Sequence, residues 1–257
     1  MSNHSVGVRT FKYRLYPTPA QEKRLRRIVD SARHLYNMAL AERKWAWELE
    51  KRNVSRAELE KLAKHYRARF APELFSQTAQ SVVKQVDLAF QAFFRRVKAG
   101  ETPGYPRFKG RNRFHSVEFK QFGVGAKLDG RRLKVFSVGR IAVRWHRQLE
   151  GDIKTVRIVH KAGRWYACFT CEVPESDPLP ATGQIVGLDV GISALITTSD
   201  GEKVAHPAFY RKGQTKLRRL QRKLARAQRG SSNRRRALQA VQRQHEHVAN
   251  QRADYLH

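Results

Sequence analysis

The stretch "VGVRTFKYRLYP", residues 6–17, predicts a β-strand near the start of the chain. The aromatic and aliphatic side chains of Phe11, Tyr13 and Leu15 alternate with polar ones such as Lys12. Alternation with a period of two is the pattern of a strand that buries one face and exposes the other. The chain therefore opens with a strand whose second face carries cations, and a pair of prolines ends it.

The net charge restricts the kind of partner. The 257 residues include 52 Lys and Arg against 22 Asp and Glu, a formal charge of +30. This surplus makes the free protein repel itself, so a polyanionic partner is expected. A hydrophobic content of 40% argues against a disordered basic tail. The sequence shows no apolar run of membrane length, no signal-peptide core and no disulfide framework. These features, with the net charge, predict a cytoplasmic nucleic-acid-binding protein without a membrane partner.

Helical periodicity follows the first strand. Apolar stripes at helical spacing predict three helices, over residues 18–52, 55–70 and 76–100. Thr18 is a suitable N-cap for the first, and Ser55 begins a capping-box pattern for the second. In the third, Gln77, Gln80 and Lys84 lie off the apolar stripe and are candidates for contacting a partner.

From residue 105 onward the pattern becomes β. Short strands are predicted over residues 116–122, 132–136, 141–145, 153–160 and 165–173. The segment before them interleaves the aromatic residues Tyr105, Phe108 and Phe114 with the cations Arg107, Lys109, Arg111 and Arg113. Aromatic faces stack on bases while cations hold phosphates, so this composition suits nucleic acid. The alternative, that Phe108 and Phe114 belong to the core, is left open by the sequence.

The two cysteines do not predict a zinc site. Cys168 and Cys171 form a C-x-x-C within a strand pattern, where positions three apart point to opposite faces. A second C-x-x-C is not present in the chain. His245 and His247 flank Glu246, but this spacing does not place two imidazoles on one helical face as H-E-x-x-H does.

After a proline-containing linker at residues 176–183, the stretch "GQIVGLDVGISALITTSDGEKVA" predicts a β-hairpin that opens a second domain. Asp200 suits its turn. Asp189 stands in an apolar strand, where a buried carboxylate costs desolvation energy unless a cation meets it. Asp189 is either a residue of a solvated edge strand or a metal ligand.

The last segment, residues 206–257, predicts a basic helical hairpin. It carries 14 Lys and Arg against only Glu246 and Asp254. A merely solvated surface would mix both signs, so this one indicates contact with a phosphate backbone. The candidate contacts are Arg218, Arg219, Arg222, Arg234 and Arg235, and the packing stripe of the second helix is Leu238, Val241, His245, Val248, Arg252 and Tyr255.

Four stretches together resemble the transposon-encoded TnpB (OrfB) family. They are "FKYRLYPTPAQEKRLRRIVDSARHLYNMAL", "AFFRRVKAGETPGYPRFKGRNRF", "VGLDVGI" and "HEHVANQRADYLH", in the family's order and spanning essentially the whole chain. The resemblance implies an α+β multidomain fold with a wedge-type β-barrel, an inserted helical recognition lobe, and part of an RNase H-like (RuvC) α/β domain with a basic helical hairpin. These regions would be residues 1–16 with 105–175, residues 17–104, and residues 184–257.

The same resemblance implies an RNA-guided, Mg²⁺-dependent DNA endonuclease with a guide RNA and a target DNA as partners. Asp189 would be its first RuvC carboxylate, both catalytic and metal-binding, and Gln80 and Lys84 would contact DNA beside the target. The family's other two carboxylates and a four-cysteine zinc module lie beyond the hairpin in which this chain ends, so we expect a truncated RuvC domain. One carboxylate cannot hold a catalytic metal pair, so Mg²⁺ is expected only with the missing carboxylates. The alternative is a nuclease-inactive RNA- and DNA-binding remnant or regulator.

Overall fold

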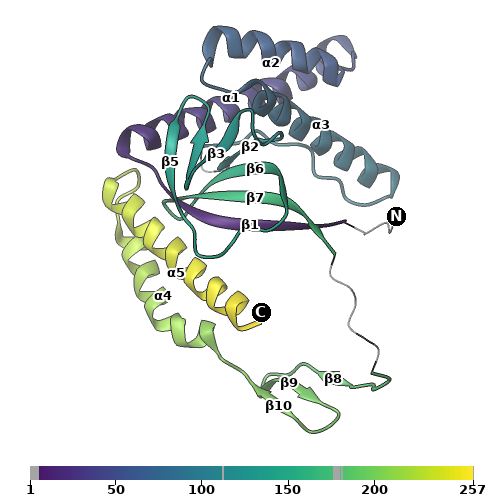
Figure 1. Cartoon of the computed structure of the whole chain (residues 1–257). Coiled ribbons are helices and arrows are strands. Elements are labelled where there is room, and N and C mark those ends of the chain that lie inside the picture. Colours follow the sequence, from purple (N-terminus) through teal and green to yellow (C-terminus); the bar gives the residue numbers. More distant parts are fainter. Residues whose placement is uncertain (1–5, 112, 176–179, 181, 257) are drawn as a thin grey trace. The chain divides into compact units, whose positions relative to one another are not determined.

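The computed structural model describes residues 6–256 apart from 112, 176–179 and 181. The chain divides into two compact units, Met1–Glu175 and Ser176–His257 (Figure 1). Most of the linker predicted at 176–183 lies outside the described residues. In the part of the chain that is described, no helix is long and apolar enough to cross a membrane.

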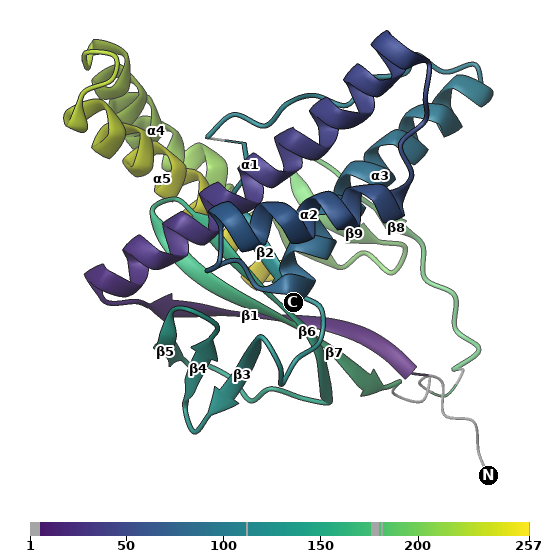
Figure 2. The ribbon, with the colours of Figure 1, turned by 90° about the horizontal axis from the view of Figure 1, so that it is seen from above.

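A seven-stranded antiparallel sheet forms the centre of the first unit (Figures 1 and 2). Its spatial order is β2-β6-β7-β1-β5-β4-β3. The strands are β1 (Val6–Tyr16), β2 (Ser116–Phe119), β3 (Ala126–Asp129), β4 (Arg132–Val135), β5 (Gly139–Arg144), β6 (Asp152–Lys161) and β7 (Arg164–Pro174). A bridge between Phe122 and Ala126 connects the two ends of this order, so the sheet curls into a nearly closed barrel.

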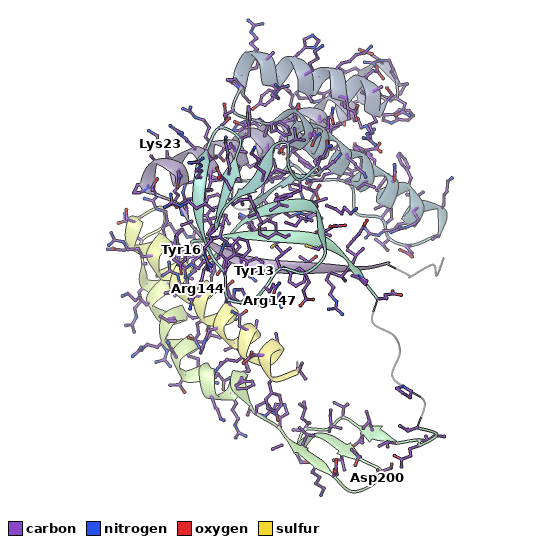
Figure 3. All side chains as sticks on the ribbon, in the orientation of Figure 1. Tyr13, Tyr16, Lys23, Arg144, Arg147 and Asp200 are labelled. Atoms are coloured by element: carbon purple, nitrogen blue, oxygen red, sulfur yellow. The ribbon has the colours of Figure 1, made fainter. Side chains whose placement is uncertain are left out.

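Strand β1 lies in the middle of the sheet because it pairs with β7 on one side and β5 on the other. Its register with β7 extends from Val6 opposite Pro174 to Leu15 opposite Trp165. The alternating pattern of the sequence is obeyed, since Phe11 and Tyr13 are buried and Val8 is 69% exposed. The hydroxyl of Tyr13 lies within hydrogen-bonding reach of two backbone oxygens, 3.4 Å from that of Arg147 and 3.3 Å from that of Gln148 (Figure 3).

Three helices interrupt the sheet between β1 and β2, namely α1 (Pro19–Glu50), α2 (Arg56–Phe70) and α3 (Ser76–Lys98). Both predicted N-caps are present. Thr18 forms a capping box with Gln21, and Ser55 forms one with Glu58. The side-chain amide of Gln21 also donates to the backbone oxygen of Arg140 at 2.8 Å, which ties the start of α1 to β5.

Polar contacts hold the helices together and onto the sheet. Arg43 of α1 forms a largely buried ion pair with Asp87 of α3 at 2.7 Å and donates to the backbone oxygen of Val54. On α3, Thr78 donates to the backbone oxygen of Glu118 in β2 at 2.9 Å. A buried ion pair offsets its desolvation cost only when its other hydrogen bonds are also made. Because Arg43 makes both contacts, it holds α1 and α3 in a fixed position relative to each other.

The second unit contains a small antiparallel sheet and a helical hairpin. Its elements are β8 (Leu188–Asp189), β9 (Ala194–Thr198), β10 (Lys203–Ala205), α4 (Phe209–Arg226) and α5 (Ser232–Leu256), with the strands in the order β10-β9-β8. The predicted turn at Ser199–Gly201 does not end the hairpin but leads to β10, a strand that the sequence analysis missed. Strand β3 was also missed, although the Asp129-Gly130 pair after it is a turn signal.

The packing face of α5 differs from the predicted stripe. Ala237, Val241, Gln244 and Val248 are buried, whereas Leu238 is 40% exposed and His245 is exposed. The close approach of the helices explains the difference. A Cβ added to Gly213 of α4 would lie 3.1 Å from a methyl of Val248 and 3.2 Å from the side-chain nitrogen of Gln244. The glycine therefore selects which face of α5 meets α4.

Replacing Gly151 by alanine is expected to destabilise the protein by roughly 3 kcal/mol or more. Gly151 has a φ of 74°, and an added Cβ would lie 2.0 Å from the backbone oxygen of Glu172 in β7. The matched control is Gly130→Ala, at a φ of 57° with open space around it, which should cost only about 1 kcal/mol. Urea denaturation of both variants measures the difference, and equal losses would contradict close packing at Gly151.

Candidate nucleic-acid interface

The loop before β2 is anchored on α1. The side chain of Asn37 accepts from the backbone N–H of Lys109 at 2.7 Å and donates to the backbone oxygen of the same residue at 3.0 Å. The ammonium of Lys109 lies over the ring of Tyr36, 5.5 Å from its centroid. Lys109 was predicted as a nucleic-acid contact, and here it fixes the loop to the helix.

The other three predicted cations of this loop are exposed. They are Arg107, Arg111 and Arg113. Of these three, Arg111 alone has an acid within ion-pair distance among the described residues, namely Asp30 at 3.7 Å. The question left open for the two phenylalanines has two answers: Phe114 is 7% exposed and packs on Tyr36, whereas Phe108 is 48% exposed. The loop therefore combines cations with two exposed aromatic rings, since Tyr105 is 45% exposed as well.

Gln80 and Lys84 are exposed on α3, beside the end of β2. Lys120, which was not predicted from the sequence, follows β2 and lies close enough to Lys84 for their charges to interact. The pKa of Lys120 is lowered, first by burial and then by the positive charges of Lys84 and Arg56. The positive charges of these two lysines repel each other. Binding of an anionic partner would relieve this repulsion, so the site favours an anion.

Glu118 of β2 holds α3 and β2 together. Its carboxylate accepts hydrogen bonds from the Ser81 hydroxyl at 2.5 Å and from Arg157 at 3.1 Å. Burial alone would raise the pKa of Glu118, but these two hydrogen bonds and the charge of Arg157 outweigh it and lower the pKa below its usual value. Glu118 is therefore a charged anchor beneath Gln80 and Lys84.

The helical hairpin forms an open groove of about 760 Å³ between α4 and α5. Every charged side chain lining it is a cation: Arg219, Arg222, Lys223 and Arg226 from α4, and Arg236 from α5. The four on α4 share one helical face, where each like-charged pair costs roughly 0.2–0.5 kcal/mol. Such a face is stabilised when phosphates neutralise it.

The structure separates the predicted arginines of the hairpin by role. Arg219 and Arg222 line the groove, whereas the exposed Arg218 does not. Arg234 donates to the backbone oxygens of Leu224 and Ala227, at 2.9 and 3.1 Å, and so caps the end of α4.

Arg235, also predicted as a contact, is exposed and donates to the hydroxyl of Ser232 at 3.2 Å. Sequence reasoning missed Lys223, Arg226 and Arg236 as groove residues. Helical spacing of three, four and seven residues from Arg219 would have found Arg222, Lys223 and Arg226 together.

Asp189 lies on β8 opposite Thr197 and is exposed. The strand was expected to be buried, yet Leu188 and Val190 are 65% and 73% exposed. A Cβ on Gly191 would lie 3.9 Å from the carboxylate of Asp189, so the glycine leaves space beside it. Among the described residues, no three His, Cys, Asp or Glu side chains form a metal-binding group. A carboxylate is the type of ligand that Mg²⁺ prefers, but the ion needs several such oxygens and a lone Asp189 offers too few.

Cys168 and Cys171 both lie on β7, where Cys171 is buried and Cys168 is half-buried. Burial raises the pKa of each thiol, which disfavours the thiolate form that binds metals.

The fold is similar to that of Cas12f1, a protein solved in complex with sgRNA and target DNA. The two structures align with a TM-score of 0.54 over 97% of this chain and 76% of the other, at 12% sequence identity. At this identity the similarity establishes the fold alone.

Sequence comparisons give the family. Residues 168–257 match the OrfB family model described as "Probable transposase", and residues 8–52 match the family's "Helix-turn-helix domain". Two relatives are named as RNA-guided DNA endonucleases: one of Streptomyces pristinaespiralis, 35% identical, and InsQ of Escherichia coli K12, 31% identical. Each matches 97% of this chain, and the chain spans 62% of the length of each. The chain belongs to the TnpB (OrfB) family. In this structure the matched residues 8–52 form strand β1 and the single helix α1, without a turn between two helices.

Replacing Arg234 by glutamine should loosen the end of α4, because its two hydrogen bonds to the last carbonyls are weakened or lost. Hydrogen–deuterium exchange of residues 221–226 is expected to speed up roughly 5- to 30-fold, the equivalent of about 1–2 kcal/mol. The control Arg235→Gln removes the same charge but only an exposed bond to Ser232, and should leave this exchange unchanged. If both variants exchange alike, Arg234 is not a cap.

Proposed function

We propose that this chain is the nucleic-acid-binding, N-terminal part of an RNA-guided DNA endonuclease of the TnpB type, with guide RNA and target DNA as partners. The observation that carries the proposal is the groove between α4 and α5, whose charged lining is entirely cationic. The names of the two relatives and the Cas12f-like fold support it.

In this proposal the first unit is the wedge-type barrel with its recognition lobe. Residues 1–16 and 105–175 would form the barrel, and residues 17–104 the inserted lobe that presents Gln80 and Lys84 to DNA beside the target. The position of α1–α3 between β1 and β2 supports this division. Residues 184–257 would be the N-terminal part of the RuvC domain, with its basic hairpin on the nucleic-acid backbone.

Asp189 would be the first RuvC carboxylate and a ligand of Mg²⁺. Its exposure on β8 and the space at Gly191 support a role in which a metal and a phosphate approach it. Bound Mg²⁺ would supply Lewis-acid stabilisation of the scissile phosphate. The remaining carboxylates of the clamp would come from the part of the protein corresponding to the unmatched portion of the relatives.

A second candidate is a nuclease-inactive RNA- and DNA-binding protein. It is favoured because, within the described part of the chain, Asp189 belongs to no group of three His, Cys, Asp or Glu side chains that could hold a metal ion. The two candidates share the binding surfaces and differ only in cleavage.

The groove predicts strongly salt-dependent binding of RNA and DNA. For a labelled DNA duplex, the double variant Arg222→Gln, Arg226→Gln should reduce the slope of log K against log salt by roughly 1.8, because each lost phosphate contact contributes about 0.9. The control Lys127→Gln, Lys134→Gln removes the same charge from exposed positions of the first unit and should change the slope little. A nearly flat salt dependence of the wild type would refute nucleic-acid binding. Equal slopes for both variants would refute the α4–α5 groove as the binding surface.

The role of Asp189 predicts a loss of cleavage in a longer protein. The 257-residue chain should bind without cutting, and fusion to the unmatched part of the E. coli relative should give Mg²⁺-dependent, guided cleavage. In that fusion Asp189→Asn should abolish cleavage, because a ligand charge of the metal clamp is lost. The control is Asp200→Asn, at an exposed turn of the same sheet (Figure 3), which should cut normally. Cleavage that survives Asp189→Asn would show that Asp189 is not the catalytic carboxylate.

A further inference from the structure

Phe108 is an exposed aromatic ring on the anchored loop before β2. Its side chain is 48% exposed. The neighbouring aromatic residues of the loop make ring contacts: Tyr105, although 45% exposed, packs edge-on against Phe90 and Phe93, and the buried Phe114 lies against Tyr36. Among the described residues, no such ring contact is made by Phe108.

The loop that carries Phe108 is held in place directly after it. The adjacent Lys109 has its backbone N–H and oxygen bonded to Asn37, and its ammonium lies over Tyr36. Farther along, the N–H of Arg113 donates to the oxygen of Gly110 at 2.9 Å and closes a turn. The ring is therefore presented by a pre-formed loop, which reduces the ordering cost of binding.

The surroundings of Phe108 are cationic. Arg107 precedes it, and Arg111 and Arg113 follow on the same loop, all of them exposed. In the described part of the chain, the one carboxylate within ion-pair distance of these guanidinium groups is that of Asp30, 3.7 Å from Arg111. A protein partner would meet an apolar ring surrounded by excess positive charge, whereas a nucleic acid matches both: its bases have π-faces, and its phosphates are anionic.

We propose that Phe108 stacks on an unpaired base of RNA or DNA while Arg107 and Arg113 hold the adjacent phosphates. The proposal rests on the proposed nucleic-acid-binding function and adds a base-stacking subsite to it. A base inside a duplex already stacks on its neighbours, so the ring is available only to a single-stranded or flipped-out nucleotide.

The test compares oligonucleotides that differ only in their bases. Fluorescence anisotropy is measured for the full chain with labelled U20, dT20 and a 20-mer of abasic deoxyribose phosphates, which keeps the DNA phosphate charge. Phe108→Ala should weaken binding of U20 or dT20 roughly 5- to 150-fold, the range for one stacked base. It should leave binding of the abasic 20-mer and the salt slope unchanged. The arm that loses affinity identifies whether RNA, DNA or both occupy the subsite.

Two further variants complete the test. Phe108→Trp should restore or strengthen binding of the base-bearing probes, because tryptophan offers a larger stacking face. Arg113→Gln should instead weaken binding of every probe and reduce the salt slope by about 0.7, the contribution of one phosphate contact on a single strand. The control Phe94→Ala removes a ring that is 56% exposed on α3, and it should leave all three affinities unchanged.

The results separate this inference from the function on which it rests. If the wild type binds none of the probes, the nucleic-acid-binding function fails. If the wild type binds but Phe108→Ala binds equally well, or loses the abasic probe as much as the others, the stacking subsite is refuted and the function stands. Circular dichroism and thermal melting confirm that the variants are folded.

Discussion

The pairing of β1 with β7 is the constraint on which the first unit depends. It joins residues 6–15 to residues 165–174. The segment of chain between them must therefore start and finish at two adjacent strands. Because β1 also pairs with β5, the strand is central in the sheet and cannot be removed without opening the barrel. The inserted helices are therefore attached to a rigid base, through Gln21 at the start of α1 and Glu118 beneath α3.

Cations serve two different purposes in this protein, and geometry separates them. Arg43 and Arg52 have carboxylate partners and hold helices or their connections in place. Those that line the α4–α5 groove lie mostly on one face of α4, where like charges repel and weaken the helix. This difference explains how a chain with a formal charge of +30 folds: structural cations are neutralised internally, and the surplus is kept on surfaces that a polyanion can cover.

Much of the fold could be predicted because its signals are local. The alternation of Phe11, Tyr13 and Leu15 predicted β1, and the capping patterns at Thr18 and Ser55 predicted where two helices begin. The short strands β3 and β10 were missed, since three or four residues give too little periodicity. The packing face of α5 was shifted because it depends on a glycine of the other helix, which no pattern within α5 can reveal.

The candidate site shows the same limit. Composition indicated a basic hairpin, but it could not distinguish Arg234 from Arg235, since neighbouring arginines look alike until the end of α4 is placed beside one of them. Likewise the sequence left Phe108 and Phe114 as equals. Only the docking of the loop on Asn37 decides which ring is buried and which is exposed.

The closure between β1 and β7 also has a consequence during synthesis. Leu15 and its partner Trp165 are 150 positions apart, since 165 − 15 = 150. At about 5–20 residues per second, a ribosome takes roughly 8–30 s to make that length. The helices α1–α3, whose contacts are local, can form in this interval, while β1 has an apolar face and two unpaired edges. The nascent protein thus passes through a stage in which its first strand is open to pairing with other chains, and the positive charge beside that strand helps to keep neighbouring copies apart.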